Sequence, residues 1–96
     1  MKIDIQVDTY SNIFKALSDK IRLKILNELS KQESMCVCDL VDYFDISQSK
    51  LSYHLKMLLD CNLITMEKLG KWNYYRINSQ ELEKYLSKEL LINILN

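Results

Sequence analysis

Two thiols, those of Cys36 and Cys38, stand two residues apart in the stretch SMCVCDL. Thiolates favour soft ions and also form disulfides, so the pair is a candidate soft-metal site or redox pair; two small core side chains are the third interpretation. On an α-helix, side chains at this spacing lie about 200° apart and cannot close on one ion. In an extended segment they share a side, with Cα atoms roughly 6.6 Å apart. Joint ligation therefore requires an extended chain, or a distorted first helical turn, at the pair.

Apolar residues at helical spacing predict four helices in the first two thirds of the chain. The first covers residues 9–17, and the second begins after Asp19, whose side chain suits an N-cap. The third starts beside the cysteines and ends near Phe44. Ser47 is a second good N-cap and opens a fourth helix over residues 48–60. The cysteine pair thus stands at the start of the third helix.

The last third of the chain predicts a hairpin and a final helix. Asn62 suits the left-handed stop that ends a helix. Residues 63–68 and 72–78 are β-branched or aromatic runs that flank Gly70 and predict two antiparallel strands, with one face of the second strand in the core. Ser79 is expected to cap a last helix that runs to the C-terminus. That helix has more apolar residues than one narrow stripe, which indicates dimerisation.

Two short helices joined by a tight turn, then a basic-tipped hairpin, is the layout of a winged helix-turn-helix. We therefore predict a mainly α fold, one domain over residues 1–96 with five helices and a two-stranded wing in the order α-α-α-α-β-β-α. The major groove of DNA admits one helix, and lysines add attraction to phosphates. A solvated helix face and turn is the alternative interpretation. The candidate DNA-binding residues are Gln48, Ser49, Lys50, Ser52, Tyr53 and Lys56 on the fourth helix and Lys68 and Lys71 on the wing.

The charge of the chain is polarised although its sum is zero, with 13 basic and 13 acidic residues. Residues 46–77 carry five basic and two acidic side chains, whereas residues 28–45 carry one basic and five acidic ones. This pattern is compatible with a basic face. The first ten residues include two aspartates, and the chain has no apolar run of about 18 residues, so we expect a cytoplasmic protein whose thiols stay reduced.

The other reactive side chains do not indicate an enzyme. The chain has no phosphate-binding glycine loop or nucleophile elbow, and His54, its only histidine, has no evident acid or nucleophile partner. We expect His54 to be a satisfied, partly buried side chain beside the leucine stripe of its helix, rather than a DNA contact. We expect Cys61 to be a small residue packed under the turn between the fourth helix and the wing.

Four blocks of the sequence resemble the ArsR/SmtB family of metal-responsive repressors, collinearly over about residues 10–78. They are ALSD with RLKIL (residues 16–19 and 22–26), CVCDL (36–40), SQSKLSYHLKML (47–58) and GKWNYYRI (70–77). The resemblance implies a homodimeric winged-helix protein that binds a palindromic operator and releases it when a metal or metalloid binds. It also implies that Cys36 and Cys38 are the thiolate ligands, and that the first and last helices pair across the dimer.

The resemblance favours As(III) or Sb(III) as the effector. Cadmium- and lead-type members take extra cysteines from the N-terminal arm, and zinc- and nickel-type members use histidines of the last helix; this chain has neither. Trivalent arsenic or antimony accepts two protein thiolates plus an exogenous thiol or hydroxide. The arsenic-type pattern often has a third cysteine, and Val41 occupies that position here. Cd(II), Pb(II) or another soft metal, and oxidants or reactive sulfur species, remain the alternatives.

The position of the pair suggests how binding would reach DNA. The helix that follows the cysteines is the first helix of the predicted helix-turn-helix. An ion that requires a distorted helix start binds the operator-free form better and, by reciprocity, lowers operator affinity by the same factor. Typical couplings of about 1–3 kcal/mol correspond to roughly 5- to 150-fold.

Overall fold

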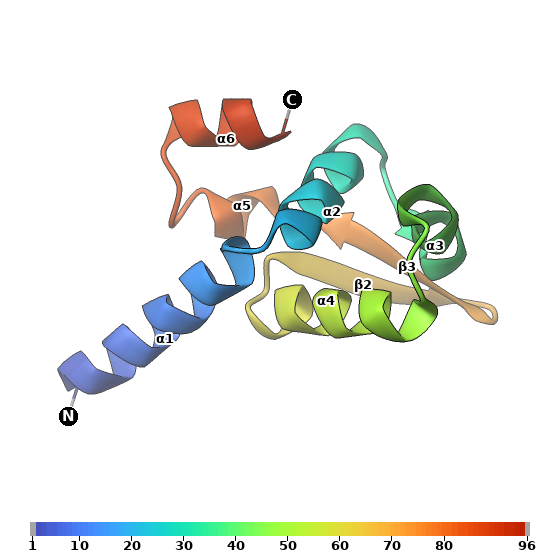
Figure 1. Cartoon of the computed structure of the whole chain (residues 1–96). Helices are drawn as coiled ribbons and strands as arrows, with labels where there is room; N and C mark the ends of the chain where they lie inside the picture. The colour runs from blue at the N-terminus through green and yellow to red at the C-terminus, as the bar shows by residue number, and fades with distance from the viewer. Residues whose placement is uncertain (1, 96) are drawn as a thin grey trace.

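The computed structural model describes the backbone of residues 2–95 and the side chains of residues 6–95. The chain folds into helices and one three-stranded antiparallel sheet, whose strands are separated by helices or turns in the sequence (Figure 1). The elements, in chain order, are α1 (Lys2–Leu17), α2 (Lys20–Lys31), β1 (Met35–Cys36), α3 (Val37–Phe44), α4 (Gln48–Asp60), β2 (Ile64–Leu69), β3 (Trp72–Ile77), α5 (Ser79–Leu82) and α6 (Lys88–Leu95).

Side-chain caps fix the helices that precede the wing. The Asp19 carboxylate accepts the amides of Ile21 and Arg22 at 2.7 and 3.2 Å and begins α2. The hydroxyl of Ser47 accepts the amide of Lys50 at 3.2 Å and begins α4. These two predicted N-caps are confirmed. Asp45, in the left-handed region with φ 52°, makes the tight turn between α3 and α4.

The wing is the hairpin of β2 and β3. Its register pairs Ile64 with Ile77 and Leu69 with Trp72, and Gly70 turns the chain with φ 64°. Asn62 has φ 60°, so its predicted role as a left-handed stop after α4 is confirmed. These strands are joined by β1, which pairs with β3 and was not predicted. A two-residue strand has no sequence period, and its partner lies about forty residues further along the chain.

The core lies between α2, α4 and the sheet. Leu51, Leu55 and Leu58 of α4 are at most 1% exposed, as their stripe predicts, and pack with buried leucine and isoleucine side chains of α2. On β3, Tyr75 faces the core, whereas Trp72 is exposed. The buried leucines therefore leave the opposite side of α4 free for polar residues.

Both terminal segments differ from the prediction. Helix α1 begins at Lys2 rather than near residue 9, and it projects from the rest of the fold as an arm (Figure 1). The single last helix is divided into α5 and α6. Ser79 is the first residue of α5, not its cap, and Asn78 at the cap position makes no side-chain cap bond. Ser87 accepts the amide of Leu90 at 3.1 Å near the start of α6.

Helix α6 returns to α2. The side-chain amide of Asn27 donates to the backbone carbonyl of Ile94 at 2.8 Å. The hydroxyl of Ser30 donates to the backbone carbonyl of Leu95 at 2.7 Å. These two bonds close the carboxyl end of α6 onto the polar side of α2. Within the described residues, no helix is long and apolar enough to span a lipid bilayer.

Candidate metal centre and nucleic-acid interface

The two thiols meet at the first turn of α3. Cys36 is the N-cap of α3 with extended backbone angles (φ −81°, ψ 165°), and Cys38 is the second residue of that helix. Their Cα atoms are 5.3 Å apart and their sulfurs form a disulfide. The extended alternative is therefore the correct one: one extended residue is enough to bring the sulfurs together, and α3 needs no distortion. The structure describes the pair in its oxidised form, and the expectation that both thiols stay reduced in the cell remains a prediction.

Cys36 also caps α3 in a reciprocal arrangement with Asp39. Its Sγ accepts the amide of Asp39 at 3.4 Å, and its own amide donates to the Asp39 carboxylate at 3.3 Å. This is a capping box in which cysteine and aspartate replace the usual serine or threonine and glutamate. The role of Asp39 was not predicted, because the sequence signature of this box begins with a serine or threonine and not with a cysteine.

The capping box brings three potential ligands together. The sulfurs of Cys36 and Cys38 and a carboxylate oxygen of Asp39 lie within 4.8 Å of one another. Cys36 is 4% exposed, whereas Cys38 and Asp39 are exposed, so an ion would reach the cluster from the solvent side. Val41, at the position of the family's third cysteine, packs partly against the core. The chain thus offers two soft donors and one hard donor here.

All predicted DNA-binding residues of α4 are exposed. The six lie outside the leucine stripe, and Tyr53 is 58% exposed. They include short donors and acceptors, one amide and two lysines, which are groups that reach base edges and phosphates. Lys68 and Lys71 are exposed at the end of the wing, on either side of the turn. The ammonium of Lys56 is 3.2 Å from the Asp60 carboxylate, so part of its charge is already balanced.

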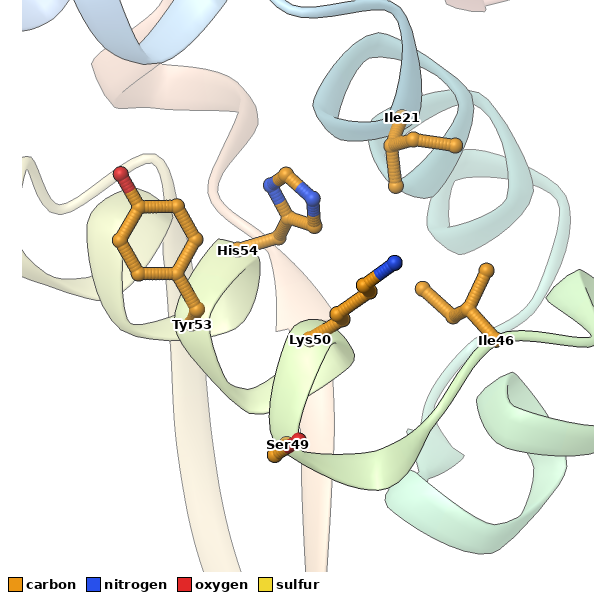
Figure 2. A pocket seen from close by; sticks show the side chains of 6 residues that line it. All are labelled: Ile21, Ile46, Ser49, Lys50, Tyr53 and His54. Carbon is orange, nitrogen blue, oxygen red and sulfur yellow. The ribbon is translucent and has the colours of Figure 1, made fainter.

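A cavity of about 610 Å³ lies between the start of α2 and the first half of α4 (Figure 2). Ile21 and Ile46 line it from one side and Lys50 reaches toward them, whereas the Tyr53 ring stands on the outer side of α4. The cavity is open and adjoins the predicted DNA-reading residues.

His54 is bonded at the inner edge of this cavity. Its Nδ1 is 2.9 Å from a terminal nitrogen of Arg22, which is only 6% exposed. Because a guanidinium can only donate, Nδ1 accepts and the ring is neutral. Burial lowers the pKa of His54; the Asp19 carboxylate opposes this shift and Arg22 adds to it. The prediction of a satisfied, partly buried histidine is confirmed.

Cys61 lies apart from the thiol pair, at the end of α4. It is partly packed against the core, as predicted, and its Sγ donates to the carbonyl of Asn12 on α1 at 3.6 Å. Burial raises the pKa of the Cys61 thiol, and the Asp60 carboxylate raises it further. Cys61 therefore remains a neutral thiol near neutral pH and is a contact between α4 and α1.

The short α3, the left-handed turn, the exposed polar face of α4 and the hairpin after it define a winged helix-turn-helix DNA-binding protein. Comparisons with known proteins agree with this class. Residues 19–66 match the arsR family of bacterial regulatory proteins. The chain belongs to this family.

Characterised relatives share most of the chain. It is 54% identical over 81 residues to an arsenical resistance operon repressor of Bacillus subtilis, covering 84% of this chain and 77% of the relative. It is 33% identical over 81 residues to a homologue of the cadmium resistance regulator CadC from Staphylococcus aureus, covering 84% and 67%. The crystal structure of NolR from Sinorhizobium fredii is 29% identical with a TM-score of 0.78, covering 98% and 92%.

Proposed function

We propose that the protein represses an arsenical resistance operon, binding an inverted-repeat operator as a homodimer and releasing it when As(III) or Sb(III) is bound by Cys36 and Cys38. The observation that carries the proposal is the convergence of both sulfurs at the N-terminus of α3, the first helix of the helix-turn-helix. The similarity to an arsenical resistance operon repressor, at 54% identity, supports the choice of effector.

The capping box supplies the link between ion and DNA. In the reduced protein, an ion bound by both thiolates draws on the sulfur lone pairs that Cys36 offers to the Asp39 amide. Binding therefore competes with the cap of α3. Cys36 also pairs with Tyr74 of β3, so the same residue adjoins the wing. An ion that weakens either contact favours the operator-free form, and operator affinity falls by the same factor.

The proposed operator contacts are the six residues of α4 and the two lysines of the wing. Gln48, Ser49, Ser52 and Tyr53 would contact bases or nearby phosphates from α4, whereas the four lysines would contact phosphates. Support comes from their common exposure on the side of α4 opposite the core.

Homodimerisation is proposed through α1 and the last helices. Val7, Tyr10 and Phe14 are at least half exposed along one side of α1, and Leu90 and Ile92 are 48% and 53% exposed on α6. Exposed apolar residues spaced along one helix are typical of a subunit interface. Pairing of two such arms would place two α4 helices on successive half-sites of DNA.

The ion is best identified by titration of the reduced protein on operator DNA. As(III), Sb(III), Cd(II), Pb(II) and Zn(II) are added in turn, and dissociation is followed by fluorescence anisotropy. We expect As(III) or Sb(III) to release DNA at the lowest concentration. Cys36→Ser and Cys38→Ser should abolish the response and keep DNA binding, whereas Cys61→Ser is the matched control and should respond normally. A normal response in Cys36→Ser would refute the assignment of the site.

A second candidate effector is a soft divalent cation such as Cd(II). The proximity of the Asp39 carboxylate to both sulfurs favours it, because a hard oxygen completes a site that two thiolates leave open. Asp39→Asn distinguishes the two: it should weaken the response to Cd(II) if the carboxylate is a ligand, and leave the response to As(III) nearly unchanged. A third candidate is a redox sensor, because the two sulfurs are close enough to join. Peroxide or polysulfide alone would then have to release the DNA, although α3 and α4 stay intact with the sulfurs joined.

A further inference from the structure

One buried side chain, Arg22, holds three helices at once. It lies in the first turn of α2 and is 6% exposed. Its Nε donates to the carbonyl of Ala16 at 2.7 Å, and one terminal nitrogen donates to that of Lys15 at 3.1 Å. Its other terminal nitrogen donates to His54 of α4 at 2.9 Å. A single guanidinium thus connects the end of α1, the start of α2 and the middle of α4.

The chemistry of the guanidinium makes this connection rigid. The two carbonyls belong to the last turn of α1, whose backbone oxygens lack the usual helical partners. The Lys15 carbonyl also accepts the amide and hydroxyl of Ser18 at 3.3 and 2.9 Å. A cation at that end also stabilises the helix dipole. Because the donors of arginine project from one plane in fixed directions, the positions of α1 and α4 are set relative to each other. A lysine could satisfy one of these acceptors but not all three.

His54 also contacts a residue on the side of α4 that carries the proposed operator contacts. Its ring makes an edge contact with Tyr53, with centroids 5.4 Å apart and planes at 66°, and Tyr53 is a proposed operator contact. A continuous series of contacts therefore connects α1, through Arg22 and His54, with an exposed aromatic residue of α4. Cys61, which follows the last residue of α4, makes a longer contact of 3.6 Å with the Asn12 carbonyl of α1.

We propose that Arg22, held by His54, is a positioning residue that fixes α4 relative to α1 and thereby sets the half-site separation that the operator must have. This inference rests on the proposed homodimer, in which α1 lies at the subunit interface. In a dimer bound to an inverted repeat, the two recognition helices must lie about one helical turn of DNA apart. Insertion of one base pair rotates one half-site by about 35° relative to the other, so a rigid dimer discriminates against it.

The test compares three DNA duplexes: an inverted repeat selected from random DNA by the wild-type protein, the same repeat with one base pair inserted in its centre, and a single half-site. We expect the wild-type protein to bind the intact repeat about 5-fold or more tightly than the altered one. Arg22→Lys and His54→Leu should both lower this ratio to about 2-fold or less. Arg22→Lys leaves the contact between His54 and Tyr53 in place, so its affinity for the half-site should stay within about 2-fold of wild type. His54→Gln, which keeps an acceptor oxygen, should restore most of the ratio.

Two further readouts separate positioning from loss of stability. Ile25→Val is the matched control, because it removes packing from the buried face of α2 without touching the link; its spacing ratio should equal that of wild type. Acidification removes the acceptor on His54, so the wild-type ratio should fall at low pH and that of His54→Gln should not. The charged or titratable groups that face the ring are Asp19 and Arg22 on the α2 side and Lys50 and Tyr53 on α4.

The outcomes are distinguishable. A His54→Leu protein that keeps the wild-type spacing ratio, or loses affinity equally for the half-site and the full repeat, overturns the positioning role. A wild-type protein that binds one half-site as tightly as the repeat overturns the homodimer itself, and the inference with it.

Discussion

At the level of single residues, the sulfur of Cys36 has two partners at the same time, the Asp39 amide and the sulfur of Cys38. The structure joins the two sulfurs and still retains a complete α3, its cap and α4. Oxidation of the pair is therefore compatible with the DNA-binding arrangement, but it consumes both proposed ligands. One hydrogen peroxide converts the two thiols into a disulfide and two waters.

This gives a prediction for the oxidised protein. Cys61→Ser treated with peroxide should bind operator DNA about as well as the reduced protein, within about 2-fold, and should no longer release it with arsenite. A reductant should restore the response. Mass spectrometry verifies the intramolecular disulfide, and fluorescence anisotropy measures binding. Release of the operator by peroxide alone would show instead that the pair is a direct redox switch.

The spacing of the two cysteines predicted a thiol pair that can converge, and the structure confirms this through the extended residue at Cys36. The role of Asp39 could not be reached from the thiols alone, because cysteine is not among the preferred N-caps and the box therefore has no familiar first residue. The convergence of the thiols was thus predicted because it depends on local backbone geometry. The capping role of Asp39 was missed because the N-cap has an unusual side chain.

At the level of elements, α2 and α4 are held together by a neutral histidine, which makes their packing sensitive to pH. Burial lowers the pKa of His54 below its ordinary value of 6.5. A group with a lowered pKa that is neutral in the fold contributes stability above pH 6.5, and this contribution is lost as the pH falls through that value toward the folded pKa. Protonation also ends the bond from Arg22.

We therefore expect the wild-type protein to lose more stability than His54→Gln between about pH 7.5 and pH 5.5. Urea unfolding in the presence of a reductant measures the free energy of unfolding at each pH. The glutamine variant is the control for all other titrating groups. Equal losses in the two proteins would contradict the assignment of the acceptor to Nδ1.

The helices differ in how well their boundaries could be predicted from the sequence. Helices α2 and α4 were predicted because Asp19 and Ser47 are good caps and their apolar stripes are regular. The extension of α1 to Lys2 was missed because Ile3, Ile5 and Val7 alternate as in a strand. The division of the last helix was missed because Glu83 and Lys84, which follow α5, are good helix formers. The return of α6 to α2 is a tertiary effect.

At the level of the whole molecule, the arm formed by α1 exposes more large apolar side chains than a single chain would leave in contact with water. Phe14 is 52% exposed on the side of α1 that faces away from the core. Phe14→Glu should therefore convert the proposed dimer into monomers at micromolar concentration and abolish tight binding to an inverted repeat, because a charge is costly in an apolar interface. Sedimentation equilibrium measures the mass. Leu69→Glu, at a 54% exposed apolar residue of the wing, is the control and should remain dimeric.

The net charge of the whole chain is zero, so attraction to DNA must come from local basic groups. These groups differ in whether a carboxylate already neutralises them. Lys71 extends from the wing and makes no ion pair with the side chains that the structure describes, whereas Lys56 lies 3.2 Å from the Asp60 carboxylate. Each phosphate contact contributes about 0.9 to the slope of log affinity against log salt. Lys71→Ala should therefore flatten the slope of a dimer by about 2 and weaken all sequences nearly equally.

Lys56→Ala should flatten the slope by less, because the ammonium must first leave Asp60 to contact a phosphate, and an exposed pair of this kind costs up to about 1 kcal/mol to break. Asp60→Asn should do the reverse, strengthening operator binding and steepening the slope. Lys88→Ala, on α6, is the control and should leave the slope unchanged. Anisotropy titrations at several salt concentrations measure all four proteins. If Lys71→Ala altered base preference instead of the slope, the wing would be reading sequence rather than backbone.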